Sequence, residues 1–237
     1  MTIDRRRFLS YGATLTAAAL AAACDSYGPR SAGSLLKLAE RSNEKLERWL
    51  FSKGSRDVAA HGARAAGARF PVYFISPKMP VWDEASRGVW ALEVGGLVKQ
   101  PLRLTIDDLT KLPAVTQRVN HYCVEGWTAV ATWTGVRVSE LARLAGLLPD
   151  ARYVDFESFD SGYHESWDLD SATHPQTLIA YGMDGRLLGP AHGAPARLHS
   201  PIKLGYKCTK YLTRVMFLPA KTGGYWSDRG YEWYAGL

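Results

Sequence analysis

Residues 120–127 read Asn-His-Tyr-Cys-Val-Glu-Gly-Trp, and residues 132–136 read Thr-Trp-Thr-Gly-Val. Together they form the most specific segment of this sequence. The cysteine at its centre, Cys123, can supply a thiolate, which is the soft ligand that a soft, redox-active metal selects. A buried free cysteine that packs as a small hydrophobic side chain is the alternative interpretation.

Further stretches extend this pattern in order from about residue 70 to the C-terminus. They are 156–158 (Phe-Glu-Ser), 192–197 (His-Gly-Ala-Pro-Ala-Arg), 204–210 (Leu-Gly-Tyr-Lys-Cys-Thr-Lys), 225–226 (Tyr-Trp) and 230–233 (Gly-Tyr-Glu-Trp). With residues 120–136 they resemble the molybdopterin-binding domain of the sulfite oxidase superfamily. The resemblance is strongest to its compact bacterial periplasmic branch, which includes the catalytic subunit of the periplasmic methionine sulfoxide reductase.

This resemblance implies a molybdenum-molybdopterin cofactor (Mo-MPT). Cys123 matches the family cysteine whose thiolate binds molybdenum, while the other sulfur ligands come from the dithiolene of the pterin. The pterin ends in a phosphate, and Arg197 and Lys210 match the positions of the cationic groups that hold it. The resemblance therefore makes Cys123 both the metal ligand and the centre of the catalytic site.

Four more residues match positions that approach the cofactor in this family. His192 stands where sulfite oxidases carry His and the methionine sulfoxide reductases carry Asn, which implies a hydrogen bond to the cofactor. Ser158 occupies a position where the reductases use Thr, and its hydroxyl can make the same hydrogen bond. Cys208 and Thr209 fall on a stretch that is expected to approach the cofactor largely through its backbone.

Two residues have interpretations that the sequence leaves open. His121, two residues before Cys123, is expected either to line the cleft beside the cofactor or to be a satisfied buried histidine. Tyr163 ends the sequence Asp-Ser-Gly-Tyr at 160–163, where a loop could reach the open side of the metal. Its alternatives are a catalytic position in the cleft wall and a place in the core.

The basic residues also have a simpler interpretation. Arg197 could pair with a carboxylate, and the intervals of four, three and four between the last basic residues are typical of a solvated helical face. Those residues are Lys203, Lys207, Lys210 and Arg214. The net charge is +6, but the sequence contains no basic run interleaved with aromatic residues. This argues against a nucleic-acid-binding module.

The length of 237 residues, with 46% hydrophobic and 22% charged residues, is typical of one globular domain. Periodicity predicts helices at 35–50, 105–109 and 136–148, and strands at 70–75, 89–94, 153–158 and 214–218. These elements interleave without the regular strand-helix period of a doubly wound sheet, so the fold class is α+β. The resemblance implies mixed sheets with short helices, preceded by an N-terminal helix.

The N-terminus is typical of an export signal. Arg-Arg-Arg-Phe-Leu-Ser at 5–10 precedes an apolar run at 15–23, which resembles a twin-arginine signal peptide. Ala-Ala-Ala-Cys at 21–24 resembles a lipoprotein cleavage box that would leave Cys24 acylated, and cleavage by the ordinary signal peptidase is the alternative. We expect a periplasmic protein, with a membrane tether if Cys24 carries lipid. The expected segments are a signal peptide (1–24), a linker with an amphipathic helix (25–69) and the oxidoreductase domain (70–237).

The residues after Cys123 bear on the substrate. Eukaryotic-type sulfite oxidases follow this cysteine with Ala-Gly-Asn-Arg and surround their dianionic substrate with several arginines, whereas residues 124–126 here are Val-Glu-Gly. We therefore expect oxygen-atom transfer that reduces small S-oxides or N-oxides. The sequence has no Cys-x-x-Cys-His haem-attachment site, so the electrons are expected to come from a separate haem- or quinone-linked partner.

Three alternatives remain open from the sequence. One is a sulfite-type oxidase, and another is a cofactor-free periplasmic binding lipoprotein that uses the same aromatic cleft for a ligand. The third is an interaction protein in which Cys123 is bridged to Cys208, because paired cysteines of exported proteins are often oxidised.

Overall fold

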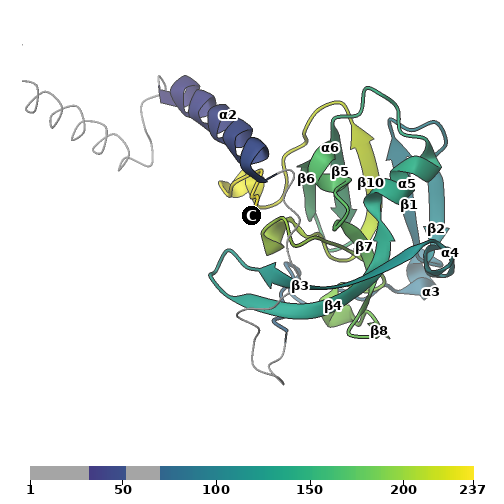
Figure 1. Ribbon diagram of the computed structural model, residues 1–237. Coiled ribbons are helices and arrows are strands. Elements are labelled where there is room, and N and C mark those ends of the chain that lie inside the picture. Colours follow the sequence, from purple (N-terminus) through teal and green to yellow (C-terminus); the bar gives the residue numbers. More distant parts are fainter. Residues whose placement is uncertain (1–31, 52–69) are drawn as a thin grey trace, which may run out of the picture. The chain divides into compact units, whose positions relative to one another are not determined.

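The computed structural model describes residues 32–51 and 70–237 (Figure 1). The twin-arginine signal, the acylation site expected at Cys24 and residues 52–69 of the expected linker lie outside the described residues. The chain divides into two units after Leu46, within the first described helix. That helix and the domain are therefore described separately.

The helix predicted at 35–50 is confirmed as α2, Ala32–Phe51. Leu35, Leu38, Leu46 and Trp49 recur at intervals that place them on one face of a helix with 3.6 residues per turn. Within the described ranges, no helix is both long enough and apolar enough to cross a membrane.

Two five-stranded sheets form the framework of the domain (Figure 1). The first runs in the order β2-β1-β10-β5-β6, with β1 parallel to β10 and the other neighbours antiparallel. Its strands are β1 Ala91–Gly96, β2 Leu102–Thr105, β5 Tyr153–Ser158, β6 His164–Asp168 and β10 Leu212–Leu218. The second runs β3-β4-β7-β8, with β9 paired to β7. Its strands are β3 Ala114–Tyr122, β4 Thr128–Arg137, β7 Leu178–Met183, β8 Arg186–Leu187 and β9 Arg197–His199.

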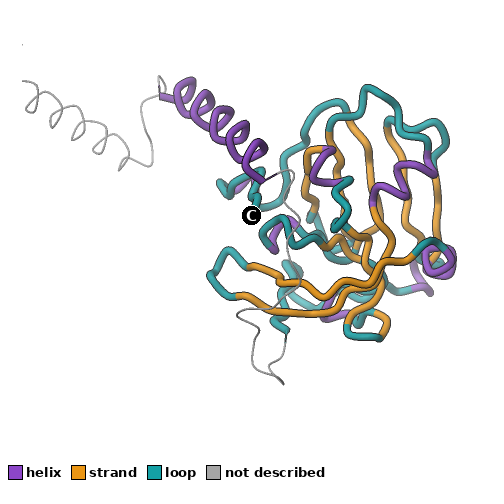
Figure 2. The backbone as a smooth tube through the Cα atoms, in the orientation of Figure 1, coloured by secondary structure: helices purple, strands orange, loops and turns teal. Residues whose placement is uncertain are grey.

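The helices of the domain are short and stand at the ends of strands (Figure 2). They are α3 Glu84–Arg87, α4 Ile106–Lys111, α5 Val138–Ala145 and α6 Leu169–Ala172, with single 3-10 turns at η1 Pro190–His192, η2 Gly205–Lys207 and η3 Ser227–Arg229. After β10 the chain is mostly loop. The predicted α+β class, with mixed sheets and few short helices, is confirmed.

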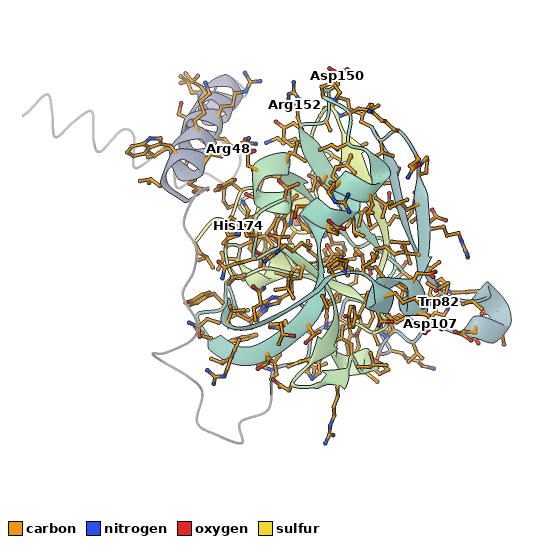
Figure 3. The ribbon with its side chains drawn as sticks, turned by 45° about the vertical axis from the view of Figure 1, so that its right-hand side comes forward. Arg48, Trp82, Asp107, Asp150, Arg152 and His174 are labelled. Atoms are coloured by element: carbon orange, nitrogen blue, oxygen red, sulfur yellow. The ribbon has the colours of Figure 1, made fainter. Side chains whose placement is uncertain are left out.

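The main hydrophobic core lies between the first sheet and α5. Leu92 of β1, Leu141 of α5, Phe156 of β5, and Val215 and Phe217 of β10 are all inaccessible to solvent. Burial of each such side chain stabilises the fold by about 1.5–3 kcal/mol relative to exposure. Figure 3 shows side chains filling the interior of the domain in the same way.

The hairpin of β3 and β4 carries the Cys123 motif. The two strands pair from Ala114 opposite Val136 to Tyr122 opposite Thr128, so the five residues 123–127 form its loop. Gly135 lets β4 lie close to β7, because a Cβ there would stand 2.2 Å from the Ile179 carbonyl oxygen. The Trp-Thr-Gly-Val stretch is therefore needed for sheet packing, whereas the cysteine stands in the loop.

Two predicted elements need correction. The strand predicted at 70–75 is wrong, because this segment is irregular. Its end is held by a side chain rather than by a neighbouring strand, since the N–H groups of Ile75 and Ser76 donate to the Asp160 carboxylate at 2.9 and 3.1 Å. The helix predicted at 136–148 is shorter, Val138–Ala145, because its first residues complete β4.

The other predicted elements are confirmed. The strand at 89–94 is β1, the strand at 153–158 is β5 and the strand at 214–218 belongs to β10. The helix at 105–109 is α4, which starts where Thr105 and Asp108 form a capping box.

Candidate functional site

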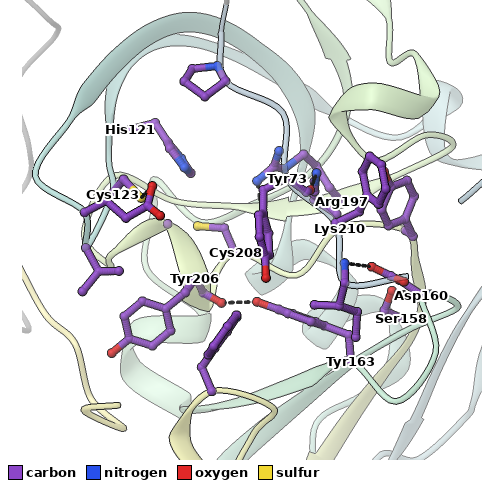
Figure 4. A pocket seen from close by; sticks show the side chains of 18 of the residues that line it. Tyr73, His121, Cys123, Ser158, Asp160, Tyr163, Arg197, Tyr206, Cys208 and Lys210 are labelled. Atoms are coloured by element: carbon purple, nitrogen blue, oxygen red, sulfur yellow. Dashed lines mark hydrogen bonds between the residues drawn. The ribbon is translucent and has the colours of Figure 1, made fainter. Parts of the chain in front are cut away.

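A pocket of about 200 Å³ collects most of the residues that the sequence motifs singled out (Figure 4). Its walls include the irregular segment 70–75, the hairpin loop 123–127, the turn after β5, η2 with the residues that follow it, and the C-terminal segment 226–231. His121 of β3 and Arg197 of β9 complete the lining. Aromatic side chains dominate this lining. Such a cavity suits a flat or apolar ligand with a few fixed polar contacts.

Cys123 lines this pocket from the hairpin loop. Its N–H donates to the Trp127 carbonyl at 2.9 Å, and its own carbonyl accepts from Gly126 N–H at 3.0 Å, which fixes the loop. Glu125 Oε2 lies 3.8 Å from the Cys123 Sγ and accepts from the Trp127 indole at 3.0 Å. Burial, and then the Glu125 carboxylate, raise the pKa of the Cys123 thiol. The raised pKa favours the neutral thiol in the protein alone, and a bound metal cation would favour the thiolate instead.

Two cations face the same pocket, and neither is in an ion pair with a carboxylate of the described chain. Arg197 is 3% exposed and donates to the carbonyls of His192 (3.2 Å) and Cys208 (3.4 Å). Lys210 donates to the carbonyls of Tyr73 and Ala191. Burial, followed by repulsion from Arg197, lowers the pKa of Lys210 to about 7. The alternative that Arg197 pairs with a carboxylate is wrong.

This arrangement fits the cofactor that the motifs imply. Buried cations are costly unless an anion compensates them, and a phosphate accepts charge-assisted hydrogen bonds from both types of side chain. The pocket thus offers a thiol for a soft metal and two uncompensated cations for a phosphate.

His121 and Cys208 also line the pocket. His121 is buried and its ring lies 5.2 Å from Phe70 and 5.9 Å from Trp127, measured between centroids. Burial, with Arg197 and Lys210 nearby, lowers the pKa of His121 to about 3, so its imidazole is neutral. Cys208 is buried, and its thiol lies 3.7 Å from the Ser200 carbonyl oxygen. Cys123 and Cys208 are both free thiols, so the disulfide-bridged alternative is wrong.

Ser158 and Tyr163 reach the pocket from either side of the turn after β5. The Ser158 hydroxyl accepts from Asp160 N–H at 2.9 Å. Tyr163 donates its hydroxyl to the Tyr206 carbonyl (Figure 4), and burial raises its pKa well above 10.0. Tyr163 is therefore a neutral part of the cleft wall, and its proton is already committed to a carbonyl.

His192 and Thr209 do not line the pocket. His192 lies in η1, where its ring packs edge-on against Phe70 at 5.6 Å. Thr209 is fully buried, and its N–H donates to the Lys207 carbonyl at 3.1 Å. Their roles toward the cofactor stay predictions.

The pocket includes residues that sequence reasoning did not assign to the site, among them Tyr73, Asp160, Tyr206, Trp226 and Tyr231. Most of them stand in the motif stretches that were quoted for the family resemblance. The density of aromatic residues in those stretches was the available signal. Tyr73 was missed because its segment has the apolar pattern of a strand.

The solvated helical face predicted for the basic residues is wrong. Lys207 is inaccessible to solvent and Lys203 is 2% exposed, because η2 is a single turn rather than a long helix. Each is paired with a buried carboxylate, Lys207 with Glu165 at 2.5 Å and Lys203 with Asp168 at 3.6 Å.

Comparison with known proteins assigns the domain. The family model described as "Oxidoreductase molybdopterin binding domain" matches residues 78–226. The chain belongs to this family. The protein is accordingly a molybdenum-dependent oxidoreductase that uses Mo-MPT, as its sulfite oxidase-type motifs predict.

The relatives that resemble this chain are named as subunits of methionine-sulfoxide reductases. The chain is 36% identical over 233 residues to the putative protein-methionine-sulfoxide reductase subunit YedZ1 of Azospira oryzae, covering 98% of this chain and 87% of that protein. It is 33% identical over 153 residues to the protein-methionine-sulfoxide reductase catalytic subunit MsrP of Ralstonia nicotianae, covering 58% of this chain and 46% of MsrP. The MsrP of Gluconobacter oxydans is 35% identical over 168 residues, with coverage of 62% and 54%. The chain thus spans about half the length of the MsrP proteins.

A solved structure supports the fold alone. The sulfane dehydrogenase SoxCD from Paracoccus pantotrophus superposes with a TM-score of 0.57 at 19% identity, covering 75% of this chain and 58% of that one.

Proposed function

We propose that this oxidoreductase reduces neutral S-oxides, with methionine sulfoxide in peptides or proteins as the leading substrate. The names of the relatives support this choice of substrate. The observation that carries it is the position of Glu125, whose carboxylate oxygen lies 3.8 Å from the Cys123 Sγ inside an aromatic pocket.

Charge separates neutral oxides from sulfite. Arg197 and Lys210 are the cationic residues of the pocket lining, and they are the groups suited to the cofactor phosphate. A dianion beside Cys123 would therefore meet the Glu125 carboxylate without a cation of its own, and holding it out of water would cost several kcal/mol. A neutral sulfoxide avoids this cost. Its apolar substituents can pack on Trp127, Tyr73 and Trp226, since thioether sulfur and aromatic rings attract each other.

The overall reaction would convert one sulfoxide, two protons and two electrons into the corresponding thioether and one water molecule. When bound, Mo-MPT supplies the two electrons and accepts the oxygen atom. Cys123 would hold the metal, and Arg197 with Lys210 would hold the phosphate. The aromatic wall excludes water from the reacting sulfur and orients the substrate, which lowers the entropic part of the barrier.

We also propose export and a separate electron donor. The twin-arginine pattern at 5–10 supports export in the folded, cofactor-loaded form, which would place the protein in the periplasm. Acylation at Cys24 would tether it to the membrane. A haem- or quinone-linked membrane partner would supply the electrons, and the subunit naming of the Azospira relative supports such a partnership.

The test is a steady-state comparison on protein purified with molybdenum. Methionine sulfoxide and dimethyl sulfoxide reduction, driven by a reduced artificial dye, are measured beside sulfite oxidation with an artificial acceptor. We expect kcat/KM for the sulfoxides to exceed that for sulfite by at least about tenfold. A kcat/KM for sulfite that is larger by that factor would move the protein to the sulfite-oxidising alternative. The cofactor-free alternative predicts no molybdenum in the purified protein.

A further inference from the structure

A buried ion pair behind the pocket joins two of its walls. Glu165 of β6 and Lys207 of η2 are both inaccessible to solvent, and Lys207 Nζ lies 2.5 Å from Glu165 Oε2. Neither residue lines the pocket, and the proposed mechanism uses neither of them.

The Glu165 carboxylate accepts hydrogen bonds from the C-terminal segment at Trp226, which lines the pocket, and at Ser227. Its Oε1 accepts from Trp226 N–H at 3.0 Å, and its Oε2 accepts from the Ser227 hydroxyl at 3.2 Å. Gly224 pairs with Glu165 in an isolated β-bridge, and a Cβ at Gly224 would stand 2.2 Å from Glu165 Oε2. The carboxylate thus fixes the backbone that carries the Trp226 indole.

Lys207 fixes a second, neighbouring part of the pocket wall. It ends η2, whose Gly205 and Tyr206 line the pocket. The Lys207 carbonyl accepts from the Trp167 indole at 3.0 Å, and its ammonium also lies 3.3 Å from the Ser227 Oγ. One ion pair therefore ties η2 and the C-terminal segment to the first sheet.

A buried ion pair is poor evidence for stability, because apolar residues of similar volume often stabilise a fold as well or better. Apolar residues could not accept the Trp226 N–H, however, and this contact is directional. We propose that Glu165 and Lys207 are positioning residues that hold Trp226 and η2 at a fixed separation and so set the width of the oxide-binding pocket. This inference rests on the proposed function for its substrate.

The chain offers a matched control in a second buried pair. Asp168 and Lys203 are each 2% exposed at the side chain and lie 3.6 Å apart. Lys203 also ties down the C-terminal segment, by donating to the Tyr234 carbonyl at 2.7 Å. Tyr234, Asp168 and Lys203 do not line the pocket, so this pair shares burial and charge with the first but lacks its contact with Trp226.

The experiment compares Glu165→Gln, the milder Ser227→Ala and the control Asp168→Asn. In molybdenum-loaded protein, KM and kcat are measured for dimethyl sulfoxide with an artificial donor. In cofactor-free protein, the alkylation rate of Cys123 by a bulky maleimide, relative to iodoacetamide, is measured by site-resolved mass spectrometry. The second measurement reports pocket width without any catalysis.

For Glu165→Gln we expect KM to rise about tenfold with kcat within about threefold of wild type, the pattern of lost uniform binding. The maleimide-to-iodoacetamide ratio should rise as well. Ser227→Ala removes the hydroxyl's two contacts, with Glu165 and with Lys207, but leaves the two charges paired with each other. It should therefore fold and shift both readouts in the same direction by about twofold. Asp168→Asn should lower the melting temperature while both readouts stay at wild-type values.

Unchanged KM and alkylation ratio in Glu165→Gln would overturn the inference, as would equal changes in Asp168→Asn. If Glu165→Gln does not fold, wild-type readouts in Ser227→Ala would overturn it. Wild-type protein that fails to reduce dimethyl sulfoxide and methionine sulfoxide would instead contradict the proposed function, and the alkylation ratio would still decide the positioning role.

Discussion

Replacing Lys210 with methionine should stabilise the cofactor-free protein while weakening its hold on the cofactor. Lys210 is partly buried beside Arg197, and its pKa falls from 10.5 to about 7. Each pH unit of such a shift corresponds to about 1.4 kcal/mol, so keeping the ammonium charged in the folded state costs at most roughly 5 kcal/mol. Lys210 keeps some exposure and two carbonyl partners. We therefore expect Lys210→Met to raise the free energy of unfolding by about 2 kcal/mol at pH 7.

The pH dependence gives this prediction its sign. Below about pH 7 the folded and unfolded states both bind the proton, so the cost of the buried charge is present in full. Between pH 7 and about 10 the unfolded lysine keeps a proton that the folded one has released, so the stability of wild type rises with pH. The difference between Lys210→Met and wild type should therefore be largest at pH 6–7 and vanish near pH 10.5.

Urea unfolding of cofactor-free protein at pH 6, 7, 9 and 10 is the assay, with the exposed Lys99 replaced by methionine as the control. Lys203, whose pKa also falls to about 7, contributes equally to both proteins and cancels in the difference. The molybdenum-to-protein ratio after purification should fall in Lys210→Met. A variant that is less stable than wild type at pH 7 without cofactor would show that the fold compensates the Lys210 charge, and the assignment of this cation to a phosphate would fail.

Three further predictions concern the site. Cys123→Ser, which replaces a soft thiolate with a hard hydroxyl, should abolish activity and alter the molybdenum electron paramagnetic resonance signal at an unchanged melting temperature; near wild-type turnover would contradict the ligand assignment. Arg197→Ala should lower the molybdenum-to-protein ratio, because each lost hydrogen bond to a charged group is worth about 1.5–3 kcal/mol, and full molybdenum content would contradict the phosphate role. Asp160→Ala removes the acceptor of the Ile75 and Ser76 N–H groups, so limited proteolysis near residues 70–78 should accelerate; unchanged cleavage there would show that other contacts hold the segment.

The chemistry of this protein could be predicted from its sequence because the relevant signals are local. Cys123 and its loop residues are contiguous, and the capping box at Thr105 depends on neighbours within a few positions. The family resemblance then joined motifs that local rules could not connect. Cys208, Arg197 and Lys210 were expected near the cofactor, and the structure brings them into one pocket with Cys123.

The errors have a common physical cause. The segment at 70–75 is apolar enough for a strand, yet the N–H groups of Ile75 and Ser76 find a carboxylate 85 and 84 positions away. The spacing of Lys203 and Lys207 fits a solvated helix, yet both ammonium groups are buried against carboxylates of β6. Hydrogen-bond and ion-pair partners so far apart in the sequence produce no periodic pattern from which they could be predicted.

By itself, then, the sequence determined the fold class and the absence of the arginine run beside Cys123, and with the family resemblance it predicted the soft metal ligand and the cations for the cofactor. Only the tertiary structure decided that Tyr163 donates its proton to a carbonyl, that His192 stands outside the pocket lining, and that Glu165 fixes Trp226. The first set follows from residue types, short spacings and the resemblance that joins the motifs. The second depends on which groups meet when β6, η2 and the C-terminal segment pack together, because hydrogen bonds and burial are properties of that packing and not of any one segment.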